Sequence, residues 1–118
     1  MRHRNKKAIL NRPADQRKAL VRNLVTSLFL YGHVTTTDAK AKALQSEAEK
    51  LITLVKGKGD DFNAIRELNR VIFTDEAAKK ALEYIKATKK TSGFTRATKV
   101  GLRAGDNALL MQVDLISE

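Results

Sequence analysis

Apolar residues recur at helical spacing in the segment that ends at Gly32. Their separations of four, four and three residues follow the period of an α-helix, which we expect to begin within residues 12–15. The opposite face carries Lys18, Arg22 and Thr26, so we expect this face to be exposed. The apolar stripe consists of Leu20, Leu24, Leu28 and Tyr31, widened by Val21 and Val25.

A short strand and a second long helix follow. Residues 33–37 are mostly β-branched, which predicts a strand. Thr37 then stands at an N-cap position with Asp38 in the first turn, and the helix ends at Gly57. Residues 56–61 form a flexible connector. The apolar face of this helix comprises Ala41, Leu44, Ala48, Leu51, Ile52 and Val55.

Two shorter helices come next. The second of them has Thr74 as its expected cap, Asp75 and Glu76 in its first turn and Lys86 near its end. Both helices have apolar faces at helical spacing. The residues of these faces are Phe62, Ile65, Leu68 and Ile72 in the first helix, and Ala81, Leu82 and Ile85 in the second.

After Gly93 the apolar pattern changes to alternation. Residues 94–100 alternate loosely and residues 109–115 cleanly, which predicts two strands joined by a turn-rich loop over 101–107. The order of elements is therefore helix, strand, three helices and two strands. It indicates an α+β, two-layer α/β domain with a small three-stranded mixed sheet, spanning residues 13–118.

The first twelve residues are strongly basic and lack any periodic apolar pattern. We expect residues 1–12 to form an extended arm that becomes ordered on a polyanion, of which nucleic acid is the commonest. The whole chain of 118 residues has a formal net charge of +10, as expected for a nucleic-acid binder. The cations of the arm are Arg2, Arg4, Lys6, Lys7 and Arg12.

Composition excludes several other classes of protein. The chain has no cysteine, which excludes disulfides, thiolate metal sites and cysteine nucleophiles. The run from Ala8 to Leu10 is too short for the core of a secretory signal, and no run approaches a membrane span. These features indicate a soluble, cytoplasmic protein without a membrane partner.

Candidate catalytic residues are few. His3 and His33 are the only histidines, and neither has a carboxylate partner at a suggestive spacing. Asp60 and Asp61 stand at a helix N-terminus, where capping explains them. The segment 57–59 lacks the trailing residues of a phosphate-binding loop. We therefore predict no enzymatic activity, no cofactor, no metal and no small-molecule substrate.

Nucleic-acid binding has better support. Aromatic residues make up only 5% of the chain, which disfavours a stacking platform for single strands. A strand separates the first two helices, which disfavours a helix-turn-helix. Arg103 stands in a glycine-flanked loop, where a guanidinium can hold a phosphate by two hydrogen bonds. The pattern favours recognition of folded RNA by shape and phosphate contacts.

These residues resemble a specific family, the bacterial large-subunit ribosomal protein seventeen. The similarity begins at residues 1–4 and 10–12 and strengthens at 17–20 and 22–24. It covers nearly the whole chain in order, whereas residues 57–92 match only in helical character. Because the chain begins directly with the family's first motif, we expect a bacterial source. Further matching segments are 36–42, 49–53, 93–96 and 103–108.

The resemblance implies a structural component of the large ribosomal subunit. It implies that the protein is ribosome-bound in the cytoplasm, binds large-subunit ribosomal RNA, and lies near the peptide tunnel exit. Its neighbours there would include the thirty-second large-subunit protein. The expected RNA-binding residues are Arg2, His3, Arg4, Lys6, Lys7, Asn11, Arg12, Arg17, Lys18, Arg22, Lys40, Lys42, Arg96, Lys99 and Arg103.

Two other classes of function remain as alternatives. A free-standing DNA-binding or nucleoid-associated protein would agree with the charge but not with the ordered motifs. A small enzyme acting on an anionic substrate would need a catalytic constellation that the residue pattern does not contain.

Overall fold

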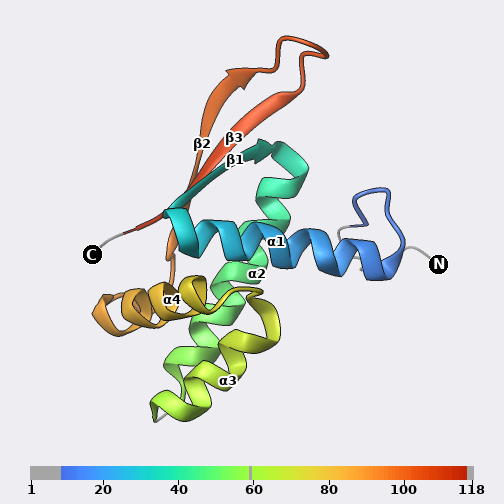
Figure 1. Ribbon diagram of the computed structural model, residues 1–118. Coiled ribbons are helices and arrows are strands. Elements are labelled where there is room, and N and C mark those ends of the chain that lie inside the picture. Colours follow the sequence, from blue (N-terminus) through green and yellow to red (C-terminus); the bar gives the residue numbers. More distant parts are fainter. Residues whose placement is uncertain (1–8, 59, 117–118) are drawn as a thin grey trace, which may run out of the picture.

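The computed structural model describes residues 9–58 and 60–116. In this part of the chain four helices and three strands follow one another in the expected order (Figure 1). The α+β class and the order of its elements are therefore confirmed. The elements are α1 (Ala14–Tyr31), β1 (His33–Thr37), α2 (Asp38–Lys56), α3 (Asp61–Val71), α4 (Asp75–Ala87), β2 (Thr95–Leu102) and β3 (Leu109–Leu115).

The three strands form one sheet in the order β1, β3, β2. Both neighbouring pairs are antiparallel, so the expectation of a mixed sheet is wrong. The reason is that β3 occupies the centre and runs opposite to both of its neighbours. A parallel pair would arise only if β1 lay beside β2. The β2–β3 pairing shifts register between Lys99 and Gly101, where Gly101 has a φ of +150°.

The strand register assigns residues to two faces of the sheet. Val34 and Ala97 both lie opposite Val113, which is completely buried, and this row packs against the core. The next row places His33 and Arg96 on either side of Asp114, and both outer residues are exposed. Because α1 and α2 contact only one side, the row centred on Asp114 lies on the uncovered face (Figure 1).

The hydrophobic core begins between the sheet and α2 and continues among the helices. α4 packs on α1, and α3 packs on both α2 and α4, which extends the core away from the sheet. This arrangement places the helical layer on one side of the strands (Figure 1). The largest fully buried side chains are Phe94, Leu28, Leu44, Ile52, Leu68, Val25 and Val113.

Helix ends follow the expected capping chemistry with one exception. Asp60 accepts a hydrogen bond from the Asn63 amide at 2.9 Å, and Thr74 accepts one from the Ala77 amide at 3.3 Å. Thr37 occupies the N-cap position of α2 but makes no such side-chain bond. Both acidic and hydroxyl residues at these starts therefore have a structural role, which confirms the capping interpretation for Asp60 and Thr74.

The buried stripe of α1 is rotated from the expected one. Val25, Leu28 and Phe29 are buried, whereas Leu24 is only half-buried and Tyr31 is 68% exposed. The expectation that Tyr31 belongs to the core is therefore wrong. Because α2 packs against α1 from one direction and α4 from another, the buried stripe follows the combined position of these partners.

The expected apolar face of α3 is also partly wrong. Phe62 is 70% exposed and Ile65 is 40% exposed, while Ala64 and Leu68 are buried. Because Ala64 is small, α3 can approach its neighbours closely. The face with Ala64 and Leu68 therefore packs inward, although Ala64 is smaller than Phe62 and Ile65. The Arg66 guanidinium lies 5.5 Å from the centre of the exposed Phe62 ring.

Candidate nucleic-acid interface

The cations near the start of α1 differ in their surroundings. Arg12 is half-buried, and its Nη1 donates to the Leu10 carbonyl oxygen at 3.0 Å. Arg17 is half-buried and Lys18 is exposed, and within residues 9–58 and 60–116 neither makes an ion pair or a side-chain hydrogen bond. Arg17 and Lys18 are therefore available to an external anion.

Arg22 has a different role from the one its helical position suggested. It is half-buried, and its Nε donates to the Val71 carbonyl oxygen at 2.9 Å. Thr26 is buried, and its hydroxyl accepts a hydrogen bond from the Phe73 amide at 3.1 Å. The expectation that Arg22 and Thr26 lie on an exposed face is wrong, because the connection between α3 and α4 packs against this side of α1.

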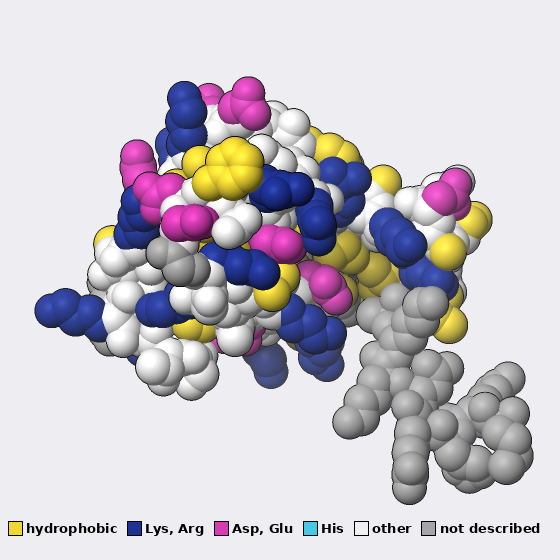
Figure 2. All heavy atoms as spheres, turned by 90° about the horizontal axis from the view of Figure 1, so that it is seen from below, with side chains coloured by type: hydrophobic (Ala, Val, Ile, Leu, Met, Phe, Trp, Pro, Cys, Tyr) yellow, Lys and Arg dark blue, Asp and Glu magenta, His cyan; other side chains and the backbone are white. Residues whose placement is uncertain are grey.

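A groove runs between α1 and α2 and is bounded at one end by the segment that leads into α1. We call it the α1–α2 groove, and its volume is about 990 Å³. Figure 2 shows hydrophobic side chains in the hollow between the main body and this leading segment, with basic side chains beside it. Its lining comprises Ile9, Leu10, Asn11, Arg17, Lys18, Val21, Arg22, Ala39, Lys42, Ala43, Ser46, Glu47, Lys50 and Val71.

The two expected cations of α2 are separated by the helix geometry. Lys42 lines the groove and is 76% exposed at its side chain, with its Nζ 3.5 Å from an oxygen of Asp38. Such an exposed i,i+4 pair is worth only about 0.5 kcal/mol or less, so it can open readily. Lys40 is half-buried, does not line the groove, and has no side-chain partner in the described part of the chain.

Sequence reasoning missed Lys50 as a member of this basic surface. Lys42, Ser46 and Lys50 are spaced four residues apart along α2, and all three line the groove. The helical period could therefore have placed Lys50 on the same face of α2 as Lys42. Lys50 lies 3.8 Å from Glu47, the one carboxylate in the groove lining, and both side chains are more than half exposed.

The β2–β3 hairpin holds the remaining expected cations. Arg96 and Lys99 are exposed and have no side-chain partner among the described residues. Arg103 instead forms a two-bond pair with Asp106, in which Nε donates to Oδ1 at 3.0 Å and Nη2 donates to Oδ2 at 2.7 Å. The Arg103 guanidinium, which the sequence predicts to hold a phosphate, thus binds a carboxylate of its own loop.

The charge of Arg103 strongly affects its partner. The hydrogen bonds from Arg103, together with a bond from the Ala108 amide, lower the pKa of Asp106 to about 2. The same pairing raises the pKa of Arg103 above its ordinary value. Asn107 beside this pair has a φ of +56°, in the left-handed region. Arg103 therefore organises the loop that joins the two strands.

The structure brings some of the expected contacts together and separates others. Asn11, Arg17, Lys18 and Lys42 line one groove. The β2–β3 hairpin that carries Arg103 projects beyond the helices, apart from the start of α1 (Figure 1). The residues Arg2, His3, Arg4, Lys6 and Lys7 lie outside the described residues.

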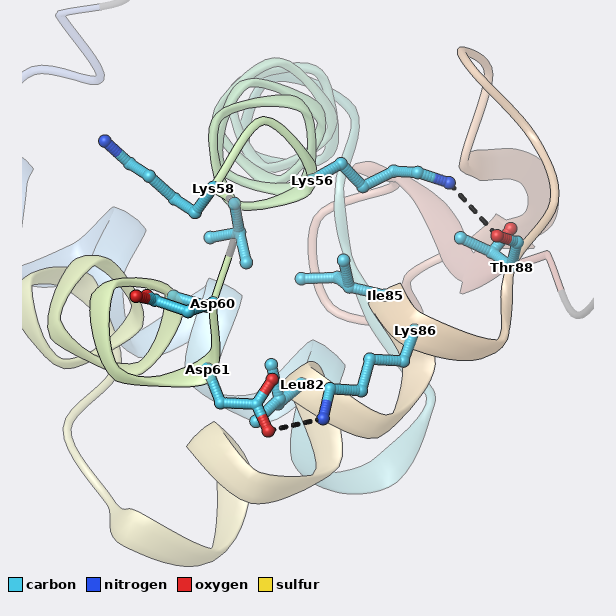
Figure 3. Close-up of a pocket in the computed structure, with 10 residues that line it drawn as sticks. Lys56, Lys58, Asp60, Asp61, Leu82, Ile85, Lys86 and Thr88 are labelled. Carbon is cyan, nitrogen blue, oxygen red and sulfur yellow. Dashed lines mark hydrogen bonds and ion pairs between the residues drawn. The ribbon is translucent and has the colours of Figure 1, made fainter.

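A second, smaller hollow of about 300 Å³ lies where α2 ends and α3 and α4 meet (Figure 3). Lys86 approaches to 2.6 Å from an oxygen of Asp61, and Lys56 donates to the Thr88 carbonyl oxygen at 3.0 Å. Asp60 caps α3 at the same place. Lys86 and Asp61 pair with each other, while Lys56 and Asp60 bond to backbone groups, which gives the hollow a structural explanation.

The described residues offer few candidates for a metal site, a catalytic site or a membrane-spanning helix. Residues 9–58 and 60–116 contain no group of three or more histidine or carboxylate residues that could hold a metal ion. His33 lies at the start of β1, opposite Asp114. None of the described helices has the length and apolar character required to cross a membrane.

These features define a small basic α+β protein with a cation-lined groove and a basic hairpin. The sequence profile described as ribosomal protein L17 matches residues 20–116. A protein of Thermoanaerobacter sp. strain X514, named large ribosomal subunit protein bL17, is 43% identical over 109 residues, which cover 91% of this chain and 96% of the relative.

Two further relatives with the same name are similar over comparable lengths. The protein of Desulforapulum autotrophicum is 43% identical over 126 aligned positions, covering all of this chain and 98% of the relative. The protein of Clostridium perfringens strain SM101 is 42% identical over 109 residues, covering 91% and 95%. The chain belongs to the ribosomal protein L17 family. It is a structural protein of the large ribosomal subunit and not an enzyme.

Proposed function

We propose that the chain binds large-subunit (23S) ribosomal RNA through its basic arm, the α1–α2 groove and the β2–β3 hairpin. The observation that carries this proposal is that two cations of the groove, Arg17 and Lys18, lack a side-chain partner in the described structure, beside the exposed Lys42 and Lys50. Phosphates are the natural counterions of such a set, because neutralising them releases condensed cations from the RNA.

The arm continues this basic surface toward the N-terminus. Asn11 lines the groove and Arg12 follows it directly, so the described end of this segment joins the domain beside the groove. The net charge of +10 supports a long-range attraction to RNA. We propose that residues 1–12 act as an arm on the RNA and residues 13–118 as the folded domain.

Membership of the family supports a proposal about the position within the ribosome. We propose that the protein lies near the peptide tunnel exit, with the thirty-second large-subunit protein among its neighbours, on ribosomes in the cytoplasm. Cross-linking of assembled large subunits with a short lysine-reactive reagent, followed by mass spectrometry, tests this position. Cross-links from this chain to the thirty-second protein are expected, and cross-links to small-subunit proteins alone would contradict the placement.

RNA binding is tested by a salt series on full-length protein and large-subunit ribosomal RNA. Changing Arg17 and Lys18 together to alanine should reduce the slope of log affinity against log salt by about two, one for each lost phosphate contact. The matched control changes Lys79 and Lys89, two exposed lysines outside the groove, to alanine and removes the same charge. Equal effects of the two double variants would contradict a localised interface.

A competition experiment addresses the alternative of a DNA-binding protein. Duplex DNA of equal length is added to the complex of the protein with ribosomal RNA at physiological salt. We expect DNA to compete poorly, because the recognised features are the shape and grooves of folded RNA. Equal competition by DNA would favour the nucleoid-associated alternative.

A further inference from the structure

The α1–α2 groove combines an aliphatic lining with basic walls. A regular RNA helix matches the basic walls but not the aliphatic lining. Its lining includes aliphatic side chains from four places in the chain: the segment before α1, α1 itself, α2 and the end of α3. These apolar groups adjoin basic side chains in the same hollow (Figure 2). The aliphatic members are Ile9, Leu10, Val21, Ala39, Ala43 and Val71.

Basic residues occupy both long sides of this aliphatic lining. Arg17 and Lys18 come from α1, and Lys42 and Lys50 come from α2. Glu47 is the only acid among the lining residues, and it is already close to Lys50. The groove therefore has an excess of positive charge on its two walls and apolar surface between them.

A paired RNA helix offers phosphates and sugars at its surface, while its base faces are stacked inside. Phosphates alone would meet the two basic walls but would leave the aliphatic lining uncovered. An unpaired nucleotide supplies both parts, since its base has two apolar faces and the strand carries a phosphate on each side. The volume of about 990 Å³ lies at the upper end of ordinary ligand sites, so a nucleotide and its flanking phosphates fit.

We propose that the α1–α2 groove binds a single unstacked nucleotide that projects from a bulge or loop of folded RNA. The base lies against Val21 and Ala43, and the flanking phosphates lie between Arg17 and Lys18 on one wall and Lys42 and Lys50 on the other. Asn11 and Ser46 supply hydrogen-bonding groups for the base edge. This inference rests on the proposed binding of ribosomal RNA and deepens it by naming the RNA element.

The charge of the groove favours RNA over a protein segment as the occupant. A protein segment would need apolar side chains flanked by acids on both edges, whereas every RNA strand has this charge arrangement regardless of sequence. Val21 and Ala43 carry no hydrogen-bonding group in their side chains, and the Asn11 amide and Ser46 hydroxyl can each donate or accept, so the groove selects for an apolar face and not for a particular base. We therefore expect a preference for unpaired nucleotides with little dependence on base identity.

The test compares two RNA hairpins with the same stem, one of which has a single unpaired 2-aminopurine. The full-length protein should bind the bulged RNA at least fivefold more tightly than the uninterrupted stem. The fluorescence of 2-aminopurine should rise on binding, because the base leaves its stacked neighbours for an aliphatic surface. Equal affinity for the two RNAs would overturn the inference while leaving RNA binding itself intact.

A groove-filling variant and a matched control locate the effect. Ala43→Leu adds bulk inside the groove without changing charge, and leucine is well tolerated in helices. Ala19→Leu makes the same change at an exposed position of α1 outside the groove. Ala43→Leu should abolish the preference for the bulge and keep the affinity for the plain stem, whereas Ala19→Leu should change neither. A preference that survives in Ala43→Leu would overturn the inference.

Two further outcomes distinguish failure of this inference from failure of the proposed function. A photo-cross-linking residue at Ser46, incorporated into assembled large subunits, should attach to RNA. Attachment to a protein would overturn the inference and identify a protein segment as the occupant. Absence of binding to both hairpins and to large-subunit ribosomal RNA would overturn the proposed RNA binding as well. Thermal melting by circular dichroism verifies that each variant is folded.

Discussion

The guanidinium carbon of Arg22 lies 4.1 Å from the centre of the Phe73 ring, directly over an aromatic face. The Arg22 Nε also donates to the carbonyl oxygen of Val71, so one side chain of α1 holds both ends of the turn after α3. Thr26, one helical turn later, accepts from the Phe73 amide and donates its own hydroxyl hydrogen to the Arg22 carbonyl oxygen at 2.7 Å. Arg22 is therefore part of the link between the first and third helices.

Changing Arg22 to alanine should destabilise the fold. The variant loses a cation–π contact and a charge-assisted hydrogen bond, and we expect the free energy of unfolding to fall by about 1–3 kcal/mol. Urea unfolding measures this loss. Lys18→Ala, an exposed change on the same helix, is the control and should shift stability by no more than about 0.5 kcal/mol.

The conservative variant Arg22→Lys separates charge from geometry. Lysine keeps the positive charge but lacks the planar fork and the Nε donor, so it should recover only part of the lost stability. Full recovery of the unfolding free energy by Arg22→Lys would contradict a geometric role for the guanidinium.

The rotated core stripe of α1 predicts a difference between two leucines. Leu28 is completely buried, so Leu28→Ala should cost about 2–5 kcal/mol through lost burial and a residual cavity. Leu24 is half-buried, and the same truncation there should cost about 1–2 kcal/mol because less apolar area returns to water. Urea unfolding of both variants checks the order, and a larger loss for Leu24→Ala would contradict this placement of the core.

Two neighbouring aspartates should have unequal effects on α3. Asp60 accepts from the Asn63 amide, so Asp60→Ala should cost about 0.5–2 kcal/mol through loss of the cap. Asp61 pairs with Lys86 where both side chains are more than half exposed, and Asp61→Ala should cost at most about 1 kcal/mol. Thermal unfolding of the two variants is the measurement, and an equal or reversed order would count against the capping role.

The loop between β2 and β3 should loosen in strong acid. The pKa of Asp106 is about 2 in the folded protein against an ordinary value of 3.8, so folding favours its charged form. The contribution of the Arg103–Asp106 pair is therefore fully present above about pH 4 and is lost as the pH falls through about 2. Carboxyl chemical shifts in a nuclear magnetic resonance titration measure this pKa.

Asp106→Asn provides the control for that titration. The variant lacks the titrating carboxylate, so the amide of Ala108 should be less protected from exchange at neutral pH, and its protection relative to the intrinsic exchange rate should not change between pH 4 and 2. A titration midpoint of Asp106 near 3.8 in the native protein would contradict the two-bond pair with Arg103.

Local features of the fold were predictable because they depend on residues close together in the chain. The helical period before Gly32, the β-branched run at 33–37 and the cap at Thr74 each act within a few residues. Tyr31 and Phe62 were placed wrongly because an apolar side chain has no fixed destination. Its burial depends on which helix packs beside it, and that is decided by contacts far apart in sequence.

The candidate site also has some features that the sequence determines and others that only the folded structure determines. The sequence by itself determined the excess of positive charge, the basic composition of residues 1–12 and the family, because these depend only on residue identity and order. The tertiary structure alone decided which cations remain available. It placed Arg22 against Phe73, and it brought Lys42 and Lys50 of α2 across the groove from Arg17 of α1. A guanidinium or ammonium group binds whatever acceptor the fold brings nearest, so its freedom to meet RNA is set only when the chain has folded.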